Sequence, residues 1–435
     1  MPPEIVILGA GTGGTLVANR LRRKLGDQAR ITVIDRDDEH VYQPGLLFVP
    51  FGMAEPADIV RSRRAQLHGG IGFELAEVDR VETATDTVHL SDGRTIGYDV
   101  LVIATGAVLA RDETEGLDDQ EWGRSIHTFY DLDGATELRD ALAGFESGRL
   151  VVNVIDMPIK CPVAPLEFCF MADWKLRERG VRDEVEIVFV TPFDGAFTKP
   201  VASERLGGLL AERGVEIETE FATGRVEGDR RRLVSWDERE LPYDLLVTIP
   251  AHSGASYVGR SPRLGDELNF VPADRNTLRS KAAENVFVIG DAADVPTSKA
   301  GSVTHFEGET VAENVERTLA GKPLTGFYDG HANCFVETGF RRALLIDFDY
   351  DTEPLPGRYP EPHLGPLPLL EPSRLNHLAK LAFQPLYWHV LLPGYDIPGV
   401  SSEFRGVEAA PATAGRPFAD PTTPDPTTTR SKATR

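Results

Sequence analysis

The sequence predicts an α/β protein with two similar domains, each built on a parallel β-sheet. Three observations support this prediction. The apolar run 5–8 leads through a glycine-rich turn into a helical pattern, as in a buried parallel strand followed by its crossover helix. The strand-like segment 98–106 is closely repeated at 243–250, which indicates a duplicated α/β unit. A further apolar strand at 285–291 follows the second copy, so we expect the second unit to be inserted into the first.

The composition and charge of the chain narrow the function classes. Its 435 residues leave room for about three domains, and 41% hydrophobic with 26% charged residues is ordinary for a globular protein. A net charge of -22 argues against nucleic acid as a partner, because phosphate contacts need a positive field. Three cysteines without short spacing exclude a disulfide scaffold or a zinc ribbon. We expect no metal site, no secretory signal and no transmembrane segment.

The N-terminal turn carries the clearest binding motif. Gly9, Gly11 and Gly14 have G-x-G-x-x-G spacing, in which glycines allow a tight turn and a close approach to a pyrophosphate. The free N–H groups of the following helix then face the anion. The second strand, 29–34, ends in Asp35, the acidic residue expected to bind the ribose hydroxyls. The sequence therefore predicts a dinucleotide site, the alternative being an ordinary tight strand-to-helix turn.

The remainder of the first unit contributes further loops to the same site. Residues 71–90 alternate as strands, and 91–94 is a hairpin turn signal. The strand that begins at 98 ends in Ala104-Thr105-Gly106, where backbone can pass close to a bound dinucleotide. The strand at 285–291 ends in Asp291, which can accept a hydrogen bond from a ribityl hydroxyl. The next helix, running to about residue 320, can direct its N–H dipoles at an electron-rich ring.

The second unit has the same predicted fold as the first but lacks its glycine motif. We expect strands at 149–155 and 184–190 and helices at 165–179 and 202–213. Where the first unit has its glycines, the second has the segment 156–162, with no glycine and with Cys161 at the strand-to-helix turn. A pyrophosphate therefore cannot approach this turn as it can approach the first.

The C-terminal region is different in character. Residues 328–350 predict a hairpin with Cys334 on its first strand. Residues 374–392 are rich in leucine and aromatics, and we expect Pro385 to divide them into two short helices. Such a segment can lie in a membrane interface, or it can pack on the core as a helical pair. From residue 401 the chain has no periodicity and is expected to be disordered.

These segments resemble the sulfide:quinone oxidoreductases of the flavoprotein disulfide reductase superfamily over about residues 4–400. The specific motifs are Tyr42-Gln43-Pro44, the turn 160–165, Pro296-Thr297-Ser298-Lys299, the block 328–334 with 337–339, 347–350 and 386–388. We therefore expect two Rossmann-like, dinucleotide-binding-type domains and a C-terminal membrane-interface helical region. The expected boundaries are 1–107 with 271–327 for the first domain, 108–270 for the second, 328–400 for the hairpin and amphipathic helices, and 401–435 for the tail.

The resemblance implies FAD in the first domain. Its expected contacts are Gly9, Gly11, Gly14, Asp35, Gln43, Val78, Thr105, Gly106, Asp291, Gly301, Ser302 and Val303. Many members carry a further cysteine that in some binds the flavin covalently, but residues 107–160 contain none. We therefore expect non-covalent FAD.

The resemblance also implies that Cys161 and Cys334 are the redox pair. Hydrosulfide would attack one sulfur of their disulfide to give a persulfide and a thiolate, and two electrons would then pass through the flavin to a quinone. We expect thiolate character at Cys161, at a predicted helix N-terminus beside Lys160. Lys299 could stabilise the reduced ring or be a surface lysine, and Cys169 is interpreted as a buried core thiol.

Three other functions fit parts of this pattern. A type 2 NADH dehydrogenase shares the fold, but the second unit lacks the glycine motif for its nicotinamide cofactor. The flavoprotein subunit of a sulfide dehydrogenase would need export. A redox-gated interaction protein of the apoptosis-inducing-factor type leaves the paired cysteines unexplained. We expect a peripheral protein bound through 374–392 to the cell membrane, on the cytoplasmic face since no signal is present, and a homo-oligomer stays open.

Overall fold

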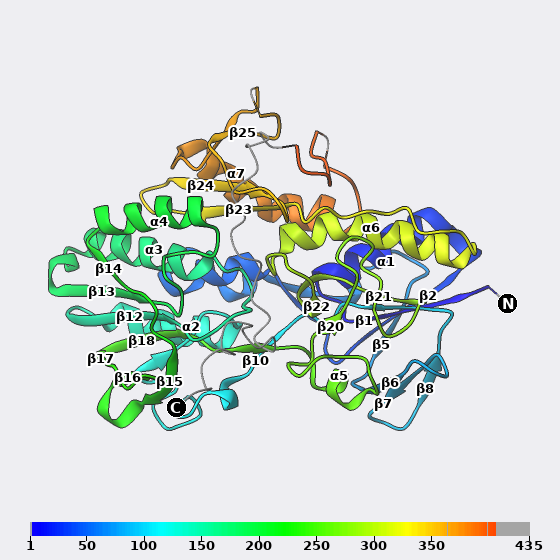
Figure 1. The fold of residues 1–435 in the computed structure, drawn as a ribbon, viewed down its shortest axis with the longest axis horizontal. Helices are drawn as coiled ribbons and strands as arrows, with labels where there is room; N and C mark the ends of the chain where they lie inside the picture. The colour runs from blue at the N-terminus through cyan, green and yellow to red at the C-terminus, as the bar shows by residue number, and fades with distance from the viewer. Residues whose placement is uncertain (1, 363, 398, 406–435) are drawn as a thin grey trace, which may run out of the picture.

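The computed structural model describes residues 2–362, 364–397 and 399–405 of the chain. Two α/β halves lie side by side, each with helices above its central sheet and a small antiparallel sheet below in the view of Figure 1. The hairpin of β23 (Ala332–Glu337) and β24 (Ala343–Phe348), together with α7 (Arg374–Leu386), spans the top of both halves. The predicted α/β class with parallel sheets is confirmed.

The first half is built on a five-stranded parallel sheet in the order β21-β9-β1-β2-β5. Alternate residues of its central strand β1 enter two different cores, because side chains of a strand alternate between the faces. Ile5 and Ile7 pack with the helices, whereas Val6 and Leu8 pack with the small sheet. The elements are β1 (Glu4–Leu8), α1 (Thr12–Leu25), β2 (Arg30–Asp35), β5 (Gly72–Leu75), β6 (Val78–Glu82), β7 (Thr87–Leu90), β8 (Thr95–Gly97), β9 (Val100–Ile103), β21 (Val286–Val288) and α6 (Gly301–Leu319).

The second half repeats this topology. Its parallel sheet has the order β11-β18-β12-β13-β14, in which β12 takes the place of β1 and β18 that of β9. The predicted sequence repeat therefore corresponds to a repeat in strand order. The elements are β11 (Ile126–His127), α2 (Leu132–Gly144), β12 (Gly148–Val154), α3 (Ala164–Arg179), β13 (Val185–Val190), α4 (Pro200–Glu212), β14 (Val215–Glu218), β15 (Thr223–Glu227), β16 (Arg232–Ser235), β17 (Glu240–Pro242) and β18 (Leu245–Ile249).

The chain crosses between the halves at β10 (Val108–Leu109) and β19 (His252–Ser253), which pair with each other. We expected the second domain to extend to residue 270. Instead, α5 (Ser256–Arg260) packs on the first half, with Tyr257 in the same core as Val81. The backbone N–H of Val81 also donates to Ser261 Oγ at 2.8 Å. The return crossing thus lies near residue 252.

The two halves meet around the short helices η2 (Gln43–Leu47) and η3 (Val49–Phe51), which pack against α2 and α3. The rings of Phe51 and Phe168 are 5.0 Å apart across this interface. Cys169 is fully buried in the same core, so its predicted role as a core thiol is confirmed. Residues on both sides of the crossing are therefore held by one continuous hydrophobic cluster.

The C-terminal helix differs from the prediction. Pro385 does not divide it: α7 runs through the proline to Leu386 and continues as a π-helical turn, η10 (Tyr387–Leu391). A proline removes an i→i−4 hydrogen bond, and a wider π-turn is one way for a helix to accommodate such a disruption. Tyr387 and Trp388 are then directed into the main core, where both are buried.

Phe404, within the predicted tail, packs on the rest of the chain. The backbone N–H of Phe404 donates to Asp329 Oδ2 at 2.7 Å, and the Phe404 ring lies 5.7 Å from that of His331. Residues 406–435, the remainder of the predicted tail, lie outside the described residues. Among the helices that the structure describes, none has the length and apolar character needed to cross a membrane.

Candidate active site

The glycine turn is shaped by backbone contacts. Gly9 has φ of +95°, and a Cβ there would lie 2.4 Å from the carbonyl oxygen of Ala104. A Cβ on Gly14 would lie 1.8 Å from the carbonyl oxygen of Gly9. Gly11, in contrast, has no atom within 4 Å of its Cβ position. Gly9 and Gly14 are therefore required by the fold, while Gly11 leaves open space in front of α1.

The carboxylate of Asp35 braces this turn. Its Oδ2 accepts the backbone N–H of Ala10 at 2.6 Å and the guanidinium of Arg63, and its Oδ1 accepts the N–H of Arg36 at 2.8 Å. An ionised carboxylate has about four acceptor positions, so capacity for a ribose hydroxyl remains. The first turn of α1 has neither a capping side chain nor an acidic residue, which leaves its N–H groups for an anion.

The other predicted contacts gather at the same edge of the first sheet. Gly106, after β9, and Gly301, at the start of α6, also have no atom within 4 Å of their Cβ positions. Thr105 Oγ1 lies 3.2 Å from the hydroxyl of Tyr257. Asp291 follows β21, and burial raises its pKa while Lys299 and Lys160 oppose that effect. Because β9 and β21 are parallel neighbours, these loops emerge together.

The remaining predicted positions are distributed around this edge. Val78 begins β6, three residues after Leu75, which pairs with Asp35 in the sheet. Gln43 is exposed at the start of η2, and its Oε1 lies 3.4 Å from Lys160 Nζ of the second half. The first turn of α6 contains Gly301, Ser302 and Val303, and the Ser302 hydroxyl donates to the Asn333 carbonyl at 2.6 Å.

Lys299 is held more tightly than a surface lysine. Its ammonium donates to the carbonyls of Asp291 at 2.9 Å and Ala293 at 2.8 Å, and it lies 4.2 Å from the centre of the Phe270 ring. Its own carbonyl accepts the backbone N–H of Cys161 at 2.7 Å. Lys299 therefore ties the turn after β21 to the turn that carries Cys161.

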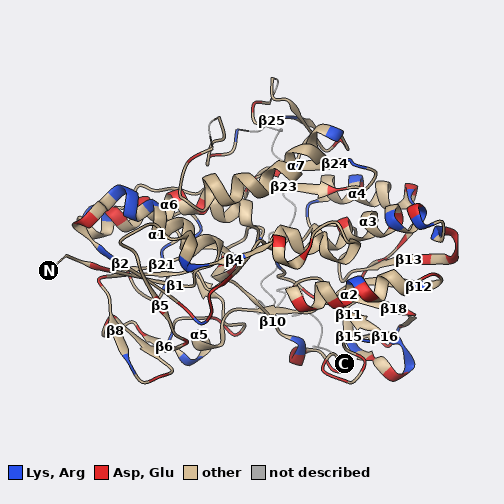
Figure 2. Cartoon of the chain, turned by 180° about the vertical axis from the view of Figure 1, so that it is seen from behind, with Lys and Arg blue, Asp and Glu red and all other residues tan. Residues whose placement is uncertain are grey.

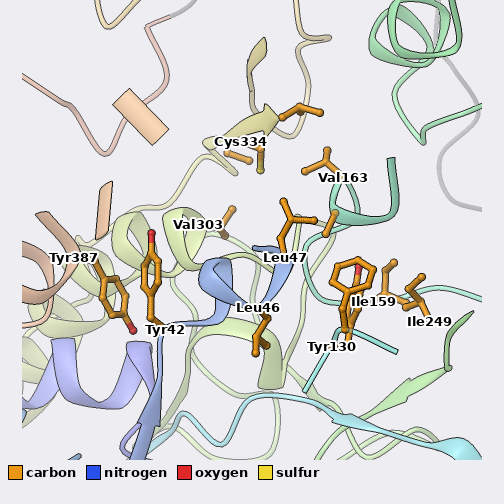
Figure 3. Close-up of a cluster of buried hydrophobic side chains, with 14 of the residues drawn as sticks. Tyr42, Leu46, Leu47, Tyr130, Ile159, Val163, Ile249, Val303, Cys334 and Tyr387 are labelled. Atoms are coloured by element: carbon orange, nitrogen blue, oxygen red, sulfur yellow. The ribbon is translucent and has the colours of Figure 1, made fainter. Parts of the chain in front are cut away.

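The second half places a cysteine where its glycine turn would be. Cys161 has a left-handed φ of +44°, three residues before the first residue of α3. Cys334 lies on β23, which the C-terminal hairpin brings across the interface. Figure 3 shows Cys334, Val163 and Leu47 converging from three different elements in one buried cluster. The two thiols are near enough for Cys334 to raise the pKa of Cys161, and all three cysteines are free thiols in the structure.

The prediction of thiolate character at Cys161 is wrong in this structure. Burial raises the pKa of Cys161 well above its usual range, and it raises that of Cys334 to about 12. The Lys160 ammonium is not directed at the Cys161 thiol, because its Nζ donates to the carbonyl oxygen of Tyr130 at 3.2 Å. The backbone N–H of Ala164, the first residue of α3, does lower the pKa of Cys161, but burial outweighs it.

Two charged residues that were not predicted lie beside the thiols. Lys380 of α7 forms a buried ion pair with Glu167 in the first turn of α3. Glu167 raises the pKa of both cysteines and Lys380 lowers it. The pair therefore sets the charge around the thiols, and it links α7 to the same site.

Known proteins match this chain over most of its length. The pyridine nucleotide-disulphide oxidoreductase family matches residues 3–152. A mitochondrial sulfide:quinone oxidoreductase of Mus musculus is 26% identical over 399 residues, with 90% of this chain and 87% of the relative covered. The chain thus resembles the sulfide:quinone oxidoreductases over nearly its whole length. Relatives with another electron donor share the fold, since a type II NADH:quinone oxidoreductase of Haemophilus influenzae is 32% identical over 74% of this chain and 82% of its own length.

A solved structure shows the same fold. The sulfide:quinone oxidoreductase of Aquifex aeolicus superposes with a TM-score of 0.77 at 22% identity, covering 90% of this chain and 92% of its own. Within the sulfide:quinone oxidoreductase family, the free N–H groups of α1 and α6 and the open space at Gly11, Gly106 and Gly301 fit FAD, the cofactor of these flavoproteins. Two features carry this fit: the backbone N–H groups at the starts of α1 and α6, which no capping side chain uses, and the glycine positions, where a side chain would occupy the space open to the cofactor.

Proposed function

We propose that the chain is a sulfide:quinone oxidoreductase in which sulfide is oxidised at Cys161 and Cys334 and two electrons pass through FAD to a quinone. The observation that carries the proposal is the second strand-to-helix turn. This turn has no glycine for a nicotinamide pyrophosphate, and its half-buried Cys161 packs against the buried cluster that contains Cys334, near enough for Cys334 to raise its pKa. The missing glycine also argues against an NADH-dependent dehydrogenase, although a relative of that type shares the fold.

The sulfur chemistry follows from the two thiols. In the oxidised enzyme Cys161 and Cys334 form a disulfide, and hydrosulfide attacks one of its sulfurs. A new S–S bond forms to give a persulfide, the old bond breaks, and the other cysteine leaves as a thiolate. Lys380 stabilises the negative charge on that thiolate, because its ammonium lowers the pKa of both cysteines.

FAD, when bound, accepts two electrons from the sulfur centre and delivers them to the quinone. Its residues in this chain would be those of the first sheet edge, Gly11, Asp35 and Gly106 with Asp291 and the first turn of α6. We place Lys299 as a positioning residue, because its ammonium is bonded to the carbonyls of the turn that carries Asp291. No further cysteine stands between residues 107 and 160, so we propose that the FAD is not covalently attached.

The function is tested by anaerobic addition of sulfide to the purified holoenzyme while the flavin absorbance is followed. We expect sulfide to bleach the flavin and a short-chain quinone to restore it. NADH at the same concentration should leave the flavin oxidised. Rapid bleaching by NADH without a response to sulfide would instead establish the NADH dehydrogenase.

We also propose that α7 binds the surface of a membrane. Leu375, Leu378 and Leu381 lie on one face of the helix and are 45%, 59% and 45% exposed, whereas Lys380 and His377 face inward to Glu167 and Glu337. The helix carries no acidic residue and is mostly tan in Figure 2, although the chain as a whole is acidic. An apolar stripe on a helix too short to span fits insertion into one leaflet, from which a quinone could reach the flavin.

The substitution Leu378→Asp tests this docking. Placing a carboxylate at the centre of the stripe should shift most of the enzyme from pelleted vesicles of anionic and zwitterionic lipid to the supernatant, while FAD content is kept. Leu268→Asp, at a leucine that is 46% exposed in the first half, is the matched control and should still pellet. Co-sedimentation of the Leu378 variant at the wild-type level would contradict the proposal.

A further inference from the structure

A closed network of hydrogen bonds joins the C-terminal segment to the glycine turn. The hydroxyl of Tyr387 lies 2.7 Å from Thr12 Oγ1 and 2.6 Å from His40 Nε2. His40 Nδ1 lies 3.1 Å from the carbonyl oxygen of Ala10, which is part of the turn. Tyr387 and His40 are each 2% exposed, so water does not compete for these contacts.

The direction of each hydrogen bond follows from the groups present. A carbonyl only accepts, so the His40 Nδ1–H must donate to Ala10 and Nε2 must accept. Burial lowers the pKa of His40 to about 4, which keeps the ring neutral near neutral pH. Tyr387 then donates to Nε2, and its oxygen accepts the hydroxyl proton of Thr12. The network is complete without using any N–H of the first turn of α1.

After Tyr387 the chain runs along α1. We term the segment 387–396 the C-terminal brace. Asn19 Nδ2 donates to the carbonyl of Leu392 at 2.7 Å, and Arg23 donates to the carbonyl of Gly394 at 3.0 Å. The aromatic ring of Tyr387 lies 5.0 Å from that of Tyr42, and Figure 3 shows these two side chains next to each other. The brace thus contacts α1 at its first residue and over its following turns.

We propose that Tyr387 is a positioning residue for FAD, and that FAD and the C-terminal brace stabilise each other. The network fixes Thr12 and Ala10 in the conformation in which the N–H groups of α1 are free for the pyrophosphate. Any ligand that requires this conformation favours the docked brace, and the docked brace must favour the ligand by the same factor. The inference rests on the proposed FAD site, but it assigns a role to a segment distant in sequence from the binding motif.

The experiment compares the FAD dissociation constants of wild type, Tyr387→Phe, Thr12→Val and the double variant after removal and re-addition of FAD. Tyr387→Phe loses the buried hydrogen bonds to both Thr12 and His40, which should raise the constant about 5- to 10-fold. The double variant should be little worse than the worse single variant, since both changes break the same contact. Tyr98→Phe is the control, because that buried hydroxyl has no hydrogen-bond partner among the described residues and precedes β9 at the opposite end of the sheet.

Hydrogen exchange gives a readout that does not depend on turnover. Amides of the C-terminal brace should exchange more slowly with FAD than without it in wild type, and this difference should shrink in Tyr387→Phe. Wild-type FAD affinity in Tyr387→Phe, additive effects in the double variant, or equal exchange with and without FAD would each overturn the proposal. If Tyr387→Phe does not fold, Thr12→Val alone must still weaken FAD. A wild-type protein that binds no FAD would refute the cofactor assignment instead.

Discussion

Replacing either Cys161 or Cys334 with alanine is expected to lower sulfide-dependent quinone reduction by about 1000-fold or more while FAD remains bound. Each thiol forms or breaks a covalent bond to sulfur in the proposed relay, and losses of this order accompany removal of a covalent catalyst. The proposed flavin contacts come from the first sheet edge, so neither substitution should remove one. The measurement is steady-state turnover with sulfide and a short-chain quinone, alongside the flavin absorbance of the purified variants.

Cys169→Ala is the matched control for this experiment. Cys169 is fully buried eight residues after Cys161 and lies in the hydrophobic core, so the substitution should keep turnover and cost only about 1 kcal/mol of stability. Near-normal turnover in Cys161→Ala or Cys334→Ala would refute the two-cysteine relay. Loss of turnover in Cys169→Ala with an unchanged melting temperature would assign that thiol a role we do not expect.

The sequence predicted those parts of the fold that local patterns specify. The glycine turn, the strand-ending Asp35 and the repeated segment at 243–250 correspond to observed elements, because strand periodicity and turn chemistry are local, whereas β21 stops at Val288 and Asp291 follows in a short helical turn. The boundary near residue 270 was wrong, since α5 is assigned to the first half only by its packing on β6. Pro385 was misjudged for a similar reason: tertiary contacts of Tyr387 and Trp388 hold the helix across the proline.

The candidate site was predicted in its motifs but not in its electrostatics. The sequence offered two signals for the charged pair. Glu167 lies six residues after Cys161, and Lys380 is a charged residue in a leucine-rich helix. That they meet at the thiols depends on the C-terminal hairpin, because α7 packs on β23 and β24 and α3 packs on β23. The thiolate prediction for Cys161 failed because burial, a property of the whole fold, outweighs the neighbouring lysine in sequence.

The Glu167–Lys380 pair is therefore expected to control thiol reactivity, and its two members should act in opposite directions. Lys380→Met removes the cation that lowers the pKa of both cysteines, so less thiolate is present at any given pH below that pKa. A rise of about one unit would slow alkylation of the reduced enzyme by iodoacetamide about tenfold. Glu167→Gln removes the anion that raises the same pKa and should accelerate alkylation at the same pH.

The pH dependence and the stability of these variants separate electrostatics from misfolding. The alkaline rise in alkylation should move to higher pH in Lys380→Met and to lower pH in Glu167→Gln. Lys380→Met also leaves Glu167 buried and unpaired, which should cost about 3–5 kcal/mol of stability, whereas the double variant loses both charges and should recover much of it. Shifts in the same direction in both single variants would show that the pair only ties α7 to α3 structurally.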